Sequence, residues 1–274
     1  MKPVIISADD FAMDAAVDEA ILDLARRGVV TATAAMVWSP RWAQIAPAAR
    51  ELADSQLLDC GLHLDFTSPL ADASGHGHAH LPLLLQTVSH TLAPKPIRRS
   101  IELQLDRFEQ VYGQRPRFID GHHHVHQLPV IREQLLAALV RRYPFEAQHI
   151  GLRWCHSQPA RGSKAALIGL LGAKGLKQLA EHHGLCTNTD FSGVYDFSPA
   201  ASLPRLWRDW LSTGEGAQPL VMCHVARDDG TLGDTRRRGG DSIRAARIRE
   251  YEWLRSAAFD QLLTDLQRRP ARWQ

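Results

Sequence analysis

Short apolar segments alternate with helical segments along most of this chain, and this alternation is the feature that most restricts its fold. Residues 4–7 (VIIS) form an apolar run with β-branched side chains, residues 14–27 place apolar side chains at helical spacing, and the Val- and Thr-rich run VVTATAAMVW covers residues 29–38. Gly28 lies where the helix is expected to end. A strand, a helix and a second strand in this order form a βαβ unit, whose crossover makes the two strands parallel.

The same alternation continues to the end of the chain. Further strands are expected within residues 57–66, 115–120, 149–154 and 219–225, and helices over residues 43–53, 97–112, 129–142, 163–183 and, as one long helix or a helical pair, 242–267. Repeated βα units in 274 residues predict an α/β fold, namely an irregular or incomplete (β/α) TIM-like barrel with mostly parallel strands. Because no linker divides the chain, residues 1–274 are expected to form one domain.

Composition excludes several classes of protein. The chain has 32 Lys plus Arg and 30 Asp plus Glu, and a formal charge of +2 argues against a nucleic-acid partner. The apolar start PVIIS is shorter than the ~7–15 residues of a secretory signal, and no stretch approaches the ~18 apolar residues of a membrane span. The four cysteines are scattered and form no CxxC pair, so reduced thiols and a cytoplasmic location are expected. The sequence leaves the oligomeric state open, with a homodimer as one option.

Polar clusters follow the expected strands at four places: ADDF (8–11), GLHLDF (61–66), DGHHHVH (120–126) and MCHV (222–225). The carboxyl ends of the strands in a β/α barrel converge on one mouth, so these clusters are expected to meet there. Asp and His side chains together form a ligand set for a divalent metal. If residues 122–126 are extended, His122 and His124 point to one side and His123 to the other, which makes the first two the better candidates to face the centre.

These motifs resemble those of the YdjC-like carbohydrate deacetylases, a family that includes the chitooligosaccharide deacetylases and the hopanoid-associated proteins. The matching segments are ISADDF, GVVTATAAMV, GLHLDFT, RPRFIDGHHHVHQLP, GLRW and VMCH, and AARIREYEWL is similar to the family's closing helix. The resemblance implies an irregular β/α barrel that hydrolyses an N-acetyl group from an amino sugar. It also implies one divalent metal ion held by Asp10, His63 and His122.

Two positions depart from the family pattern. Ala12 stands where the family usually has glycine after DDF, so a backbone position suited to positive φ is altered. Val225 replaces the proline of the commoner MCHP form. Neither change touches an expected ligand. Zinc suits the mixed Asp and His ligands best, with magnesium or another divalent cation as the alternative.

Amide hydrolysis also needs groups that move protons. A metal activates water and polarises the carbonyl group, and Asp9 beside the metal ligand is the expected general base. His224 is the first candidate for the acid that protonates the leaving amine, and His124 is the second. Arg153 is expected to orient Asp9. The expected supporting residues that anchor ligand histidines or sugar hydroxyls are Asp65 and Asp120.

Two other functions compete with a deacetylase. A metal-dependent phosphoesterase or amidohydrolase usually carries HxH on its first strand, whereas this chain has an aspartate pair there. A non-catalytic, metal-stabilised sugar-binding protein has no use for a base such as Asp9 beside the metal.

Three further segments have uncertain roles. His76, His78 and His80 lie in ADASGHGHAHLP (71–82), which is expected to be a solvated loop, with lid contacts or adventitious metal capture as alternatives. The basic run 235–249 is expected to be a solvated loop and helix face, with a grip on an anionic part of the substrate as the alternative. DFSGVYDF (190–197) could present Tyr195 and Phe197 to a sugar.

Overall fold

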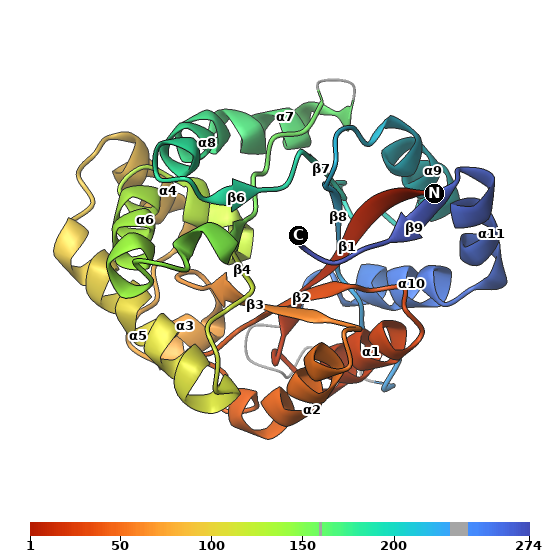
Figure 1. Cartoon of the computed structure of the whole chain (residues 1–274), viewed down its shortest axis with the longest axis horizontal. Coiled ribbons are helices and arrows are strands. Elements are labelled where there is room, and N and C mark those ends of the chain that lie inside the picture. The colour runs from red at the N-terminus through yellow and green to blue at the C-terminus, as the bar shows by residue number, and fades with distance from the viewer. Residues whose placement is uncertain (159–160, 231–240) are drawn as a thin grey trace.

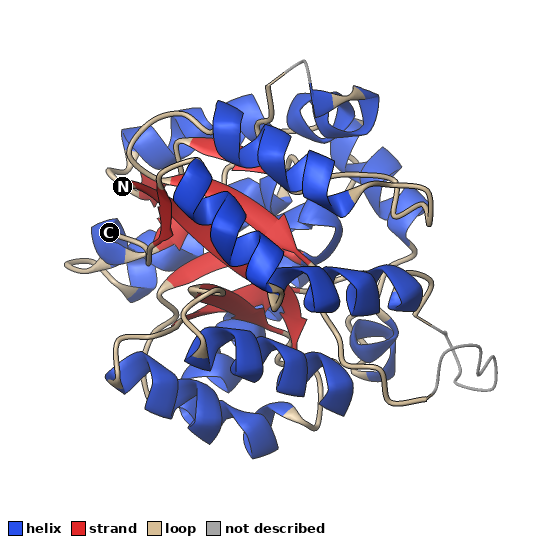
Figure 2. Cartoon of the chain, turned by 90° about the vertical axis from the view of Figure 1, so that its right-hand side faces the viewer, coloured by secondary structure: helices blue, strands red, loops and turns tan. Residues whose placement is uncertain are grey.

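The computed structural model describes residues 1–158, 161–230 and 241–274. Its helices surround a central set of strands, and both termini lie near one end of those strands (Figures 1 and 2). The strands are β1 (Lys2–Phe11), β2 (Ala32–Ala35), β3 (Asp59–Leu64), β4 (Phe118–Gly121), β5 (Gly151–Leu152), β6 (Cys186–Thr187), β7 (Asp190–Ser192), β8 (Pro219–Cys223) and β9 (Arg268–Pro270).

The helices follow the strands in the alternation expected from the sequence. They are α1 (Ala15–Arg26), α2 (Trp42–Asp54), α3 (Pro69–Ala73), α4 (His80–Val88), α5 (Pro94–Tyr112), α6 (Ile131–Arg142), α7 (Ser163–Leu170), α8 (Ala173–His182), α9 (Leu203–Thr213), α10 (Arg244–Leu254) and α11 (Ala257–Asp265), with short 3-10 helices η1 (His122–Gln127) and η2 (Ala147–His149). Within the described ranges, no helix has the length and apolar character needed to cross a membrane.

The strands form one curled sheet with the order β6-β5-β4-β3-β2-β1-β8-β7, while β9 pairs with β1. All the pairings in this sheet are parallel. In the part of the chain that the structure describes, β6 and β7 are at opposite ends of the order and do not pair with each other. The predicted incomplete barrel of parallel strands is therefore confirmed.

The interior of the barrel changes from apolar to polar along the strands. At the amino-terminal ends, Trp273 stacks on Phe118 with ring centroids 5.3 Å apart, and Ile5 belongs to the same buried cluster. Side chains alternate along a strand, so Ser7 and Asp9 follow Ile5 on the inner side of β1. Ser7 accepts a hydrogen bond from Arg153 at 2.8 Å. An apolar floor therefore lies below a polar layer at the carboxyl ends of the strands.

Some elements differ from the prediction for local reasons. The helix expected over 163–183 is two helices, α7 and α8, and Gly172 lies between them. A Cβ atom at Gly172 would lie 2.0 Å from the Gln127 carbonyl oxygen. The chain passes too close to that backbone for any other residue. β1 is longer than the expected strand at residues 4–7, because it continues through Phe11. The elements that were not predicted from the sequence are α3, α4, α9, β6, β7 and β9.

Candidate metal centre and active site

An irregularity at the end of β1 directs two neighbouring aspartates into the barrel. The register between β1 and β2 shifts between Ala8 and Phe11, and Asp10 has a φ of 66°. A residue in this left-handed conformation breaks the alternation of side chains, so Asp9 and Asp10 both point inward and are 2% and 1% exposed. Ala12 has a φ of 72°, a left-handed backbone conformation that favours the glycine usual in the family at this position.

Asp10, His63 and His122 converge at the carboxyl ends of their strands. Asp10 Oδ1 lies 3.3 Å from His63 Nε2 and 3.2 Å from His122 Nδ1, and all three ligand atoms lie within 4.8 Å of one another. Around a tetrahedral zinc ion with bonds of ~2.0–2.2 Å, neighbouring ligand atoms are about 3.3–3.6 Å apart. These three side chains fit a divalent metal by donor type and by spacing.

Asp9, His63 and Asp120 form a second group of compatible spacing. Here, however, a cation is already present, because Arg153 lies 2.7 Å from Asp9 Oδ1 and 2.5 Å from Asp120 Oδ2. The guanidinium group pairs with both carboxylates and occupies the place that a metal would take, so the first group is the better metal site.

Asp120 fixes the orientation of His63. The two residues are direct partners in the β3–β4 register, and His63 Nδ1 lies 2.6 Å from Asp120 Oδ1. This contact leaves Nε2 free to face Asp10. Burial lowers the pKa of His63, but the charge of Asp120 and the hydrogen bonds to Asp10 and Asp120 outweigh it and raise the pKa well above its usual value. A carboxylate behind a metal-binding histidine is a common supporting arrangement.

Arg153 holds Asp9 with two parallel hydrogen bonds. Its Nη1 donates to Asp9 Oδ2 and its Nη2 to Asp9 Oδ1, both at 2.7 Å, and the side chain is fully buried. Burial and the nearby charge of Asp120 raise the pKa of Asp9, while Arg153 acts in the opposite direction. The result is an ionisable carboxylate with a fixed orientation beside the candidate metal site.

Arg247 contacts the far side of the Asp10 carboxylate. Its Nη2 donates to Asp10 Oδ2 at 2.6 Å, and its Nε donates to Asp241 Oδ2 at 2.7 Å. Burial raises the pKa of Asp10, but Arg247 and the hydrogen bonds to His122 and His63 outweigh it and hold the pKa well below its usual value. Asp10 is therefore an anion with one oxygen facing the two histidines and the other facing a guanidinium group.

The histidine run does not continue the strand, so the expectation that its side chains alternate about an extended chain is wrong. β4 ends at Gly121, and His123 and His124 have φ values of 53° and 58° inside η1. This left-handed turn separates the side chains. His124 Nδ1 faces the thiol of Cys155 at 3.6 Å, and the buried His126 contacts the Arg153 carbonyl oxygen through Nε2 at 2.7 Å.

His123 turns outward from the metal group. It is exposed, its Nδ1 lies 2.9 Å from Thr67 Oγ1, and its ring stacks on exposed His80 with centroids 4.5 Å apart. The prediction that His123 faces away from the centre agrees with this placement, although the backbone reason differs.

His224 follows β8 and is fixed through its backbone. Its N–H donates to Glu250 Oε2 at 3.1 Å, and Tyr195 donates its hydroxyl hydrogen to Glu250 Oε1 at 2.8 Å. Among the residues that the structure describes, the buried His224 Nδ1 has no hydrogen-bond partner. Burial and Arg247 lower the pKa of His224 to about 3, so the ring is neutral at pH 7.

Tyr195 and Phe197 have different positions in the loop after β7. Tyr195 is buried and engaged with Glu250, so it presents no free face to a sugar. Phe197 is half-buried, has a φ of 61°, and packs edge-on against His224 with ring centroids 5.4 Å apart.

Asp65 lies away from the metal group and stabilises its own loop. Its Oδ1 accepts hydrogen bonds from the backbone N–H groups of Thr67 and Ser68, and its Oδ2 accepts from the Ser68 hydroxyl. Within the described residues, its side-chain hydrogen bonds do not involve a ligand histidine. Asp65 therefore has a structural role, in contrast to the expected support of the site.

The segment 71–82 is more ordered than the expected solvated loop. His76 is half-buried and stacks on Trp38 with centroids 4.7 Å apart. The backbone N–H of half-buried His78 donates to the Phe66 carbonyl oxygen at 2.7 Å. Of the three histidines in this segment, His80 is the exposed one.

The basic run 235–249 was expected to be solvated, and this is wrong for two of its arginines. Residues 235–240 lie outside the described residues, but Arg244 and Arg247 are 8% and 3% exposed. Arg244 forms ion pairs with Asp14 at 3.1 Å and with Asp229 at 2.8 Å. The sequence signal for the burial of Arg247 was helical spacing, because Arg247 and Glu250 lie on the same face of α10 as apolar Leu254.

The comparisons with known proteins agree with this geometry. The YdjC-like protein family model matches residues 3–265, and the chain belongs to this family. A chitooligosaccharide deacetylase from Yersinia pestis (strain Pestoides F) is 33% identical over 196 residues, which cover 66% of this chain and 76% of that protein.

Solved structures share the fold. A crystal structure from Enterococcus faecalis V583, provisionally named a cellobiose-phosphate cleavage protein, is 25% identical and superposes with a TM-score of 0.69 over 99% of this chain and 97% of that one. The peptidoglycan N-acetylglucosamine deacetylase Bc1960 is 12% identical, with a TM-score of 0.50 over 98% of this chain and 85% of that one. At this low identity, the second likeness shows the fold alone.

Proposed function

We propose that this protein is a metal-dependent carbohydrate deacetylase that removes an N-acetyl group from an amino sugar. The observation that carries the proposal is the convergence of Asp10, His63 and His122 beside an aspartate, Asp9, that is held by Arg153. The deacetylase named among the relatives in the family supplies the substrate class. An N-acetylated oligosaccharide or glycolipid is the expected substrate.

The metal would be held by Asp10, His63 and His122. Zinc is the first choice because two imidazoles and one carboxylate are ligands that it commonly takes, and magnesium is the alternative. When bound, such an ion activates water and polarises the scissile carbonyl group.

Asp9 acts as the general base in this proposal. Both of its oxygens accept hydrogen bonds from Arg153, so the carboxylate cannot rotate away from the site. Burial raises its pKa, which makes it a better proton acceptor than a solvated aspartate. Arg153 acts as a positioning residue, because it contacts Asp9 and Asp120 at once.

The acid that protonates the leaving amine is His224 or His124, with His224 preferred. Burial lowers the pKa of both rings, with Arg247 adding to the effect on His224 and Arg153 to that on His124. Each histidine is therefore neutral before the reaction, so it must first take up a proton, such as the one that Asp9 removes from the attacking water, before it can protonate the leaving amine. In the described part of the chain, His224 Nδ1 has no hydrogen-bond partner, whereas His124 Nδ1 already faces Cys155.

A sugar-binding protein without activity is the competing proposal from another class. It explains the metal group but leaves the Arg153–Asp9 pair without a purpose. We also propose a cytoplasmic location, because the four cysteines are free thiols and suit a reducing compartment.

The test measures acetate release from a panel of N-acetylated sugars by purified protein before and after chelation. His122→Ala and His123→Ala form a matched pair, since adjacent histidines face toward and away from the metal group. We expect chelation and His122→Ala to abolish both activity and bound metal, and His123→Ala to retain both. Stoichiometric metal with no acetate release from any sugar would favour the binding protein instead.

A further inference from the structure

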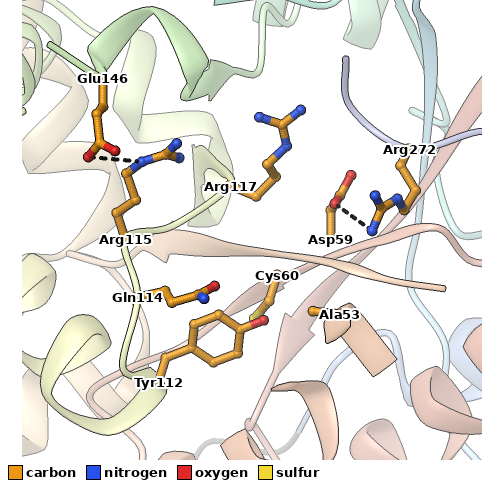
Figure 3. Close-up of a pocket in the computed structure, with 9 residues that line it drawn as sticks. All are labelled: Ala53, Asp59, Cys60, Tyr112, Gln114, Arg115, Arg117, Glu146 and Arg272. Carbon is orange, nitrogen blue, oxygen red and sulfur yellow. Dashed lines mark ion pairs between the residues drawn. The ribbon is translucent and has the colours of Figure 1, made fainter. Parts of the chain in front are cut away.

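A pocket of about 560 Å³ lies at the amino-terminal ends of β3 and β4, the ends remote from the proposed active site. Asp59 is the first residue of β3, and Arg117 directly precedes β4. Arg115 and Arg272 also line the pocket, so three guanidinium groups surround it (Figure 3). The metal group belongs to the opposite, carboxyl ends of the same strands.

Arg117 is fixed in this pocket by the protein backbone. Its Nη1 donates to the His149 carbonyl oxygen at 2.8 Å, and its Nη2 donates to the Trp273 carbonyl oxygen at 2.7 Å. These contacts orient the guanidinium plane without neutralising its charge. Its positive charge is therefore held in place before any ligand arrives.

Arg115 and Arg272 have most of their hydrogen-bonding capacity unused. Arg115 lies 3.5 Å from Glu146 Oε2, and Arg272 lies 3.7 Å from Asp59 Oδ1. Within the residues that the structure describes, neither side chain makes a hydrogen bond. A guanidinium group has five N–H donors, so both can bind an anion bidentately.

The carboxylates of the pocket do not cancel this charge. Three arginines face two acids, Asp59 and Glu146. Asp59 Oδ2 already accepts a hydrogen bond from the Trp273 backbone at 2.8 Å, and the Glu146 side chain is 61% exposed and free to swing aside. One positive charge remains in a partly enclosed space, where it attracts anions more strongly than at an open surface.

We propose that this pocket binds a phosphoryl oxyanion, either free phosphate or the phosphate of a small phosphomonoester. Arg115, Arg117 and Arg272 would donate to its oxygens, because the flat fork of donors in arginine matches phosphate geometry. The volume exceeds that of a phosphate ion and leaves room for a small organic group near Gln114. This site is independent of the proposed deacetylase activity.

The test is isothermal titration calorimetry of the intact protein with inorganic phosphate and, in a second arm, glucose 6-phosphate. The variants are the double substitution Arg115→Gln plus Arg272→Gln, and Arg205→Gln as a control on the exposed face of α9. His122→Ala is titrated in parallel, because phosphate could also bind a metal at the proposed active site. Arg272→Lys keeps the charge but loses the fork of donors, and circular dichroism checks the fold of each variant.

We expect saturable binding that persists in His122→Ala and Arg205→Gln, weakens at least about tenfold in the double variant, and falls between in Arg272→Lys. Tighter binding of glucose 6-phosphate would identify the ligand as a monoester, and equal binding would identify it as phosphate. Equal affinity in the folded double variant, loss of binding in His122→Ala, or no saturation in either arm would overturn the proposal.

Discussion

The backbone N–H of His224 donates a hydrogen bond to the buried carboxylate of Glu250 at 3.1 Å, which joins the end of β8 to α10. The other oxygen of Glu250 accepts from the Tyr195 hydroxyl at 2.8 Å. One side chain thus connects three segments that are distant in sequence. One turn earlier on α10, Arg247 contacts the candidate metal ligand Asp10 at 2.6 Å. Helix α10 therefore contacts both the candidate metal ligand Asp10 and the candidate acid His224.

Replacement of Glu250 should reduce turnover without removing the metal. In Glu250→Ala, His224 loses the acceptor for its backbone N–H, so its ring is no longer fixed relative to Asp9. We expect kcat to fall by roughly 10–100-fold, with KM and metal content near those of the wild type. Glu250→Gln keeps an acceptor and should retain most of the activity. Steady-state kinetics and metal analysis measure these effects, and equal losses in the Ala and Gln variants would contradict a positioning role.

The same residue should make stability depend on pH. Burial raises the pKa of Glu250 to about 7, although Tyr195, the His224 backbone and Arg247 act in the opposite direction. A carboxyl group whose pKa is higher in the folded protein favours folding below pH ~4.5 and loses this contribution as the pH rises through 7. Glu250→Gln resembles the protonated form, so its stability relative to the wild type should increase by on the order of 2–3 kcal/mol between pH 4.5 and 8. Urea unfolding at several pH values measures this, and parallel curves for the two proteins would disprove it.

Substitutions of Asp120 and Asp65 should distinguish a residue that supports the metal site from one that supports the fold. Asp120→Asn weakens the contact that orients His63, so metal affinity should fall by about 10–100-fold. Asp65→Asn removes charge from a carboxylate that accepts two backbone hydrogen bonds. It should cost about 1–2 kcal/mol of unfolding free energy and leave metal affinity unchanged. Competition titration with a chelating dye and urea unfolding test the pair, and a metal defect in Asp65→Asn would contradict the assignment.

The strand ends that meet at the site could be predicted from sequence because each strand is a short apolar run that stops at a polar cluster. The carboxyl ends of parallel strands share one edge, so the aspartate pair, His63 and the histidine run were expected near one another, and the family resemblance then singled out Asp10, His63 and His122. What this reasoning could not supply was the direction of each side chain. The left-handed backbone at His123 and His124 sets these directions, and the period-two pattern of an extended chain does not predict it.

The contribution of α10 was missed for a different reason. Charged residues on a helix usually face water, and the run 235–249 was interpreted in that way. Arg247 and Glu250 are buried only because Asp10, His224 and Tyr195 arrive from other segments to pair with them. A periodic apolar pattern shows which face of a helix is buried, but it does not show which polar groups from distant segments contact that face. The same applies to the pocket lined by Arg115, Arg117 and Arg272, whose residues come from five separate segments between Ala53 and Arg272.

Substitutions of Arg153 separate the effect of its positive charge from the effect of its hydrogen-bond geometry. Arg153→Lys keeps a cation between Asp9 and Asp120 but replaces a bidentate fork with a single ammonium group. We expect kcat to fall by about 10–100-fold with metal retained, because Asp9 is then free to rotate. Arg153→Met removes the cation that pairs with buried Asp9 and leaves Asp120 with His63 alone, so it should cost about 3–5 kcal/mol of unfolding free energy.

A matched control for Arg153 exists elsewhere in the barrel. Arg161 holds Asp190 with two hydrogen bonds of 2.8 and 2.7 Å, a similar bidentate pair that contacts none of the proposed catalytic residues. Arg161→Lys should therefore lower stability by a comparable amount to Arg153→Lys and leave kcat unchanged. Kinetics and thermal unfolding of the two lysine variants side by side decide the matter. If both variants lose activity in proportion to stability, Arg153 has only a structural role; if only Arg153→Lys loses activity, the orientation of Asp9 is part of the reaction.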